Sequence, residues 1–146
     1  MKFSPRLFLL ILLPLLMSFS DANQQLRDSL RLSKLPKSLN IKQHLDSAMG
    51  PDRFQLWQLN PLTDSAFKKL LHQAKASSVA QRSMSGCLGL EGSDSAPTWW
   101  PSKELEDATW DYTSSPYELY VAQPTDRDRV CIYRHSKTKI IFIQSF

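Results

Sequence analysis

The last third of the chain has the most regular alternation of apolar and polar positions. Apolar side chains alternate through residues 117–122, which predicts a half-buried strand. A polar loop at 123–128 precedes a second predicted strand at 129–135, and a turn at 136–138 leads to a third at 139–145. The pattern therefore predicts an antiparallel β-meander at the end of the chain.

A symmetric turn between the last two strands would set Tyr133 opposite Phe142 and Ile132 opposite Ile143. Aromatic and β-branched pairs of this kind stabilise antiparallel strands, and Cys131 would share the face of Tyr133. The turn contains no Asn-Gly pair, so turn chemistry alone does not fix this register.

The clearest helical pattern lies at residues 64–76. Thr63 is placed to cap its N-terminus, and Asp64 suits the positive end of the helix dipole. One face holds the apolar side chains Phe67, Leu70, Leu71 and Ala74. A shorter helical turn is expected at 104–110, after the irregular, Ser- and Gly-rich stretch 77–95.

The segments before this helix are less regular. Residues 23–35 have few apolar positions and predict either a short helix that stops before Pro36 or a mobile arm. Residues 37–50 are mixed, and residues 54–59 form a compact apolar cluster. We expect a small α+β domain with helices in its first half and a C-terminal antiparallel meander of about three strands.

The start of the chain has the layout of a secretory signal peptide. Lys2 and Arg6 precede an apolar run at 7–17, and small residues follow, so cleavage is expected after Ala22 or after Ser20. The alternative is an uncleaved anchor, but a spanning helix needs about 20 apolar residues. We therefore expect a secreted, periplasmic or cell-envelope protein of about 124 residues, with no later transmembrane segment.

These features divide the chain into three parts. Residues 1–22 are the expected signal peptide, residues 23–50 an N-terminal arm or linker, and residues 51–146 the globular domain. A single domain of this size can bury a core of its own.

Charge is divided unevenly along the chain. Residues 22–90 contain ten basic and four acidic side chains, whereas residues 91–130 contain three basic and nine acidic ones. Nucleic-acid binders gather a larger basic excess on one face, so this two-signed distribution does not predict a nucleic-acid partner.

Cys87 and Cys131 are the two cysteines of the chain. In an exported protein they predict one disulfide, with two free thiols as the alternative. The bridge would close a long loop and contribute roughly 4 kcal/mol to stability in the chain-entropy model.

An aromatic group is the most suggestive candidate for recognition, and it comprises Trp99, Trp100, Trp110 and Tyr112. Trp and Tyr anchor many interfaces, so these rings would suit a protein or glycan partner. The alternative is that they form the core beneath the sheet, since tryptophans are usually mostly buried.

The candidates for chemistry are weaker. The acidic stretch Glu104–Asp111 could supply the acid or base of a small cell-envelope hydrolase. Such a hydrolase uses a pair of carboxylates, and the distance between them, which the sequence does not give, decides the chemistry. The histidines stand far apart at 44, 72 and 135, so we expect neither a metal site nor a cofactor.

The chain resembles small exported bacterial proteins of unknown function in three features. These are the signal-like start, the Trp99-Trp100-Pro101 segment and the closing segment at 130–143. The resemblance covers about the last third of the chain and implies neither an activity nor site residues. The residues themselves favour a non-enzymatic binding domain, with the hydrolase as the alternative.

Overall fold

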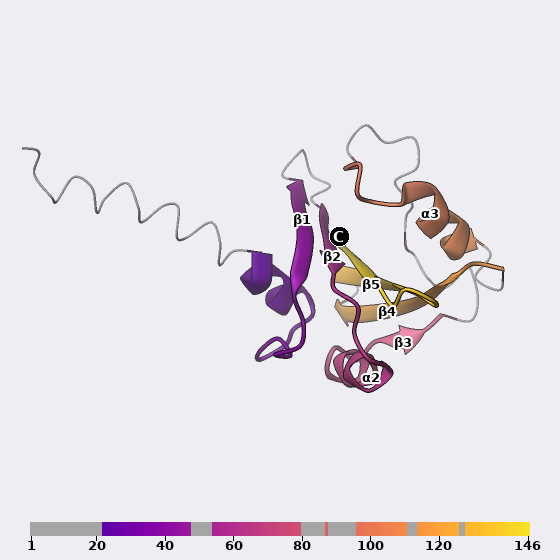
Figure 1. The fold of residues 1–146 in the computed structure, drawn as a ribbon. Coiled ribbons are helices and arrows are strands. Elements are labelled where there is room, and N and C mark those ends of the chain that lie inside the picture. The colour runs from indigo at the N-terminus through magenta and orange to yellow at the C-terminus, as the bar shows by residue number, and fades with distance from the viewer. Residues whose placement is uncertain (1–21, 48–53, 80–86, 88–95, 111–113, 126–127) are drawn as a thin grey trace, which may run out of the picture.

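A computed structural model describes residues 22–47, 54–79, 87, 96–110, 114–125 and 128–146. Six described strands form one sheet in the order β1-β2-β6-β5-β4-β3, and every neighbouring pair is antiparallel. A helix at 22–29, α2 (Asp64–Gln73) and α3 (Ser102–Trp110) accompany the sheet (Figure 1). The α+β class is as predicted.

The predicted closing meander is present as β4 (Tyr117–Thr125), β5 (Asp128–His135) and β6 (Ile141–Ser145). Its register confirms the pairs Ile132–Ile143 and Tyr133–Phe142. All five residues of β6 are buried, because β6 lies between β2 and β5 inside the sheet.

The expected strand count and helix placement were wrong. The sheet also contains β1 (Ile41–Ser47), β2 (Phe54–Leu59) and the two-residue β3 (Ser77–Ser78), and α3 lies in the second half of the chain. β2 was difficult to recognise because it is an inner strand with apolar residues on both faces, so its sequence is a run rather than an alternation.

The sheet separates two apolar clusters, which makes three layers. On one face, the helix at 22–29 and α2 cover a cluster that includes Trp57, Ile132 and Ile143. On the other face, α3 covers a cluster that includes Tyr133 and Phe142 (Figure 1). The hairpin of β5 and β6 therefore contributes to both cores, as its two apolar faces suggest.

The helix at 22–29 lies in the segment where the sequence predicts either a short helix or an arm, and it packs against the sheet. Leu26 and Leu30 have 0% and 1% of their surface exposed and lie in the same cluster as Trp57. The indole Nε1 of Trp57 donates a hydrogen bond to the carbonyl of Ala22 at 3.3 Å. Since β1 is also part of the sheet, ordered structure begins well before residue 51.

The predicted disulfide joins Cys87 to Cys131 across a sequence separation of 44. Cys131 lies on β5 and is fully buried, so the bridge fastens residue 87 to the centre of the sheet. Among the described residues, no helix is long and apolar enough to cross a membrane.

Candidate anion-binding groove

The structure describes the side chains of two of the four aromatic candidates, Trp99 and Trp100. Trp100 is 5% exposed and packs edge-on against Tyr133 and Phe142, with ring centroids 6.4 and 5.7 Å apart. Trp99 is half-buried and lies edge-on to Trp100. The side chain of Trp110, like Tyr112, lies outside the described residues, so only Trp100 is placed firmly in the core.

Two of the three acidic side chains of α3 are exposed, and the third, Glu106, is half-buried. Glu104 and Asp107 are exposed, and Asp107 accepts a hydrogen bond from the Lys103 ammonium at 3.1 Å. Asp111 lies outside the described residues. No group of three His, Cys, Asp or Glu side chains suited to a metal occurs within the described ranges.

A different surface stands out, between the loop that follows the first helix and α2. The helix ends where Arg31 adopts a positive φ of 51°. The amide of Arg31 bonds to the carbonyl of Asp28, and the amide of Leu32 bonds to that of Arg27. These two hydrogen bonds form a Schellman motif, which turns the chain sharply away from the helix axis. The following residues therefore run beside α2 rather than extending the helix.

Asn60 holds this loop in place. Its side-chain oxygen accepts from the amide of Asn40 at 2.6 Å, and its Nδ2 donates to the carbonyls of Ser38 and Pro61 at 3.1 Å. Pro61 belongs to the connection between β2 and α2. One side chain thus ties the loop to the segment that leads into α2.

α2 supplies the other wall of the groove. Thr63 caps the helix, as predicted, by accepting from the amide of Ala66 at 3.2 Å. Phe67 and Leu70 point into the core. Ala66, Lys69 and Gln73 line the groove at helical spacing on a neighbouring face.

A buried arginine fastens the start of α2 to the sheet. The Nη2 atom of Arg134 on β5 donates to the carbonyl of Leu62 at 2.8 Å and to Oδ1 of Asp64 at 2.7 Å. The bond from Arg134, with the nearby Lys139 charge, lowers the pKa of Asp64. The wall formed by α2 is therefore fixed to the sheet as well as packed on it.

Between the two walls lies a hollow of about 420 Å³. Its lining is Lys34, Leu35, Pro36, Lys37, Ser38, Ala66, Lys69 and Gln73. Leu35 and Ala66 are half-buried and pack against the core, whereas the three lysines are exposed and make no ion pair with any described residue. No carboxylate lines the hollow, so it combines an apolar base with unneutralised positive charge.

No family model, curated protein or solved structure matches this chain.

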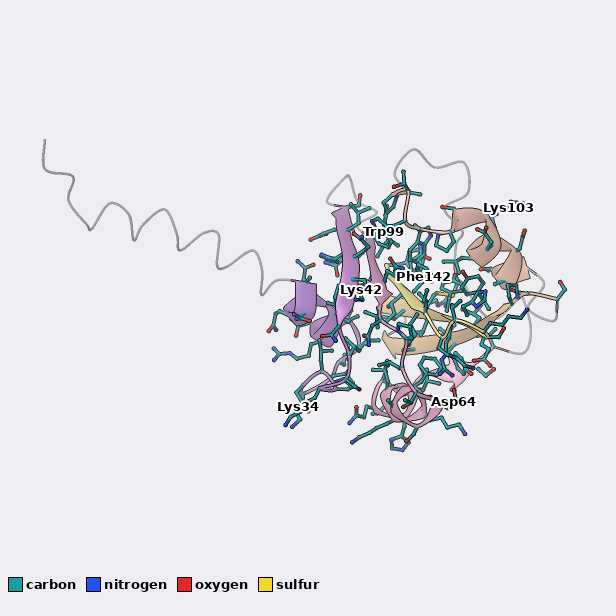
Figure 2. The ribbon with its side chains drawn as sticks, in the orientation of Figure 1. Lys34, Lys42, Asp64, Trp99, Lys103 and Phe142 are labelled. Atoms are coloured by element: carbon teal, nitrogen blue, oxygen red, sulfur yellow. A yellow bond between two sulfur atoms is a disulfide. The ribbon has the colours of Figure 1, made fainter. Side chains whose placement is uncertain are left out.

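A second hollow of about 280 Å³ adjoins the first. The two share Lys34 and Leu35, and the second is also lined by Arg27 and, from the start of the chain's first helix, by Asn23 and Gln24. Figure 2 shows Lys34 projecting at the edge of the molecule that also holds α2, far from Lys103 on α3. The two hollows form one surface, which we call the lysine groove.

Sequence reasoning did not single out the lysine groove. The basic excess of residues 22–90 was visible, as were Lys34 and Lys37 on either side of Leu35-Pro36. What the sequence could not show is that Lys69 comes to face them from α2.

Proposed function

We propose that this protein is an exported, non-enzymatic binding domain that takes an anionic ligand in the lysine groove. The observation that supports the proposal is a hollow of ligand size lined by three lysines and no acid. Small-molecule sites occupy about 300–1,000 Å³ and combine apolar surface with a few convergent polar groups.

The groove offers chemistry for recognition but none of the arrangements that catalysis needs. Lysine ammonium groups donate hydrogen bonds and attract carboxylate or phosphate oxygens. The lining holds no carboxylate or histidine that could act as a general acid or base, and its Ser38 has no partner there to activate it. Binding is therefore the role that this lining supports best.

Export is part of the same proposal. It is supported by the disulfide, which is typical of oxidising compartments, and by the signal-like start of the chain. A chain cut after Ser20 keeps the Ala22 carbonyl that accepts from Trp57, whereas a chain cut after Ala22 loses it. Intact-mass measurement of the protein from the culture medium or periplasm should give an N-terminus at Asp21 or Asn23. Recovery of the full chain from Met1 in membranes would contradict export.

The binding proposal is tested with tripolyphosphate, a small polyanion, by isothermal titration calorimetry at low ionic strength. We expect saturable one-site binding that weakens as salt is added. One lysine within 4 Å of an anion contributes about 1 kcal/mol in water. Replacing Lys34, Lys37 and Lys69 by glutamine should therefore weaken binding at least about tenfold.

A control variant with the same change in net charge separates the groove from general attraction. In this control variant glutamine replaces Lys42 on β1, Lys103 on α3 and Lys137 in the turn between β5 and β6. This variant should bind tripolyphosphate within about twofold of the unmodified protein, because these lysines line neither hollow. Equal losses in the two variants would contradict a specific site.

A further inference from the structure

We infer that the occupant of the lysine groove is an extended acidic peptide segment of a partner protein, lying across both hollows. This inference rests on the proposed anion-binding function and specifies its ligand. The two hollows share Lys34 and Leu35 in their linings and are therefore neighbours, so one chain-like ligand lying across the surface can contact both.

The charges are spread along the groove rather than gathered at one point. Lys37 and Lys69 line only the first hollow, Arg27 lines only the second, and Lys34 lines both. Compact anions would engage one end of this series, whereas a chain with repeated carboxylates would engage all of it. The charge distribution therefore favours an extended ligand with several separated negative groups.

The uncharged lining favours a peptide over an acidic glycan. Neither hollow is lined by an aromatic ring on which a sugar could stack. Leu35 and Pro36 instead present aliphatic surface that suits the aliphatic side chains of a peptide. Gln73 in the first hollow and Asn23 in the second have amide groups that can both donate to and accept from a peptide backbone.

Asp28 is an acidic residue beside the second hollow, next to Arg27. Arg27, which lines the second hollow, contacts Asp28, with Nε 3.7 Å from Oδ1, and its Nη2 donates to the side-chain oxygen of Gln24 at 2.7 Å. Asp28 lines neither hollow, yet its charge opposes an incoming carboxylate. Removing Asp28 should therefore strengthen peptide binding while removing Arg27 weakens it.

The test measures fluorescence anisotropy of a labelled short peptide composed of glutamate and leucine, with a glutamine-and-leucine peptide as control. We expect only the acidic peptide to bind the processed protein. Arg27→Gln should weaken it about two- to fivefold and Asp28→Asn should strengthen it by a similar factor, as for exposed charge pairs. Arg27→Gln should change tripolyphosphate affinity less than about twofold, because that compact anion fits the first hollow alone.

The other outcomes separate the two proposals. Lysine-dependent binding of an oligogalacturonate, or of vesicles containing phosphatidylglycerol, without peptide binding would overturn the peptide inference and leave the anion site standing. If neither Arg27→Gln nor Asp28→Asn changes the affinity for the acidic peptide, the inference that the peptide spans both hollows is wrong. If neither peptide nor tripolyphosphate binding depends on Lys34, Lys37 and Lys69, both proposals are refuted.

Discussion

Replacing Leu26 by alanine should destabilise the protein strongly, although the sequence suggests an expendable arm in this region. Leu26 is completely buried in the cluster that contains Trp57 and Ile143. Truncating a buried leucine costs about 2–5 kcal/mol, from lost apolar burial and from the cavity left behind. A small domain has a total stability of about 5–15 kcal/mol, so the loss would be a large part of it.

Urea unfolding of the disulfide-intact chain starting at Asp21 measures this effect, with Gln24→Ala as the control. Gln24 is exposed on the same helix, so its replacement should change the free energy of unfolding by less than about 0.5 kcal/mol. If Leu26→Ala were as mild as Gln24→Ala, the first helix would not be part of the core. A lower urea midpoint for Leu26→Ala with an unchanged slope would support the packing described above.

Three further changes test other parts of the structure. Replacing Cys87 and Cys131 together by alanine should lower the free energy of unfolding by roughly 4 kcal/mol, measured by urea denaturation, because the unfolded chain regains the freedom of the closed loop; an unchanged midpoint would contradict this. Burial raises the pKa of Tyr133 from 10.0 to about 12. The contribution of the neutral Tyr133 side chain to the free energy of unfolding is therefore complete below pH 10 and is lost as the pH rises through 12. Unfolding at stepped alkaline pH should show about 3 kcal/mol of extra loss relative to Tyr133→Phe, and parallel curves for the two proteins would count against it. Lys75 follows Ala74, the C-cap of α2, and has a positive φ of 53°, so Lys75→Gly should stabilise the protein by about 0.5–1 kcal/mol; a lower thermal midpoint would contradict this.

Local signals were sufficient to predict the elements whose apolar pattern faces one way. α2 was predicted from a capping Thr63 and a single apolar face, and both features are present. The hairpin of β5 and β6 has the register that a symmetric turn predicts, although the turn contains no Asn-Gly pair that would fix it.

The first helix was underestimated because the surface it buries is partly polar. Ser29 contacts Gln55 and Ser145 on the sheet at 3.4 Å, and Gln25 accepts from Gln55 at 2.9 Å. Polar residues that pack on polar residues look like solvent-facing positions in a sequence. Only the two leucines, Leu26 and Leu30, indicated the buried side.

The lysine groove could not be predicted because it depends on tertiary placement. Its loop is directed by the Schellman turn at Arg31 and held by Asn60, whose contacts join segments about 20 positions apart in the chain. No local pattern shows that Lys34 and Lys69 line one hollow. The disulfide, by contrast, followed from compartment and count alone, because two cysteines allow one pairing.

The central claim is that an anion binds this protein between residues 34–38 and α2, and two-dimensional NMR tests it most directly. Amide resonances of the ¹⁵N-labelled processed chain would be followed as tripolyphosphate is added. We predict saturable shifts concentrated at residues 34–38 and 66–73, with little change at α3. Shifts centred on α3, or spread evenly over every exposed lysine, would contradict the claim.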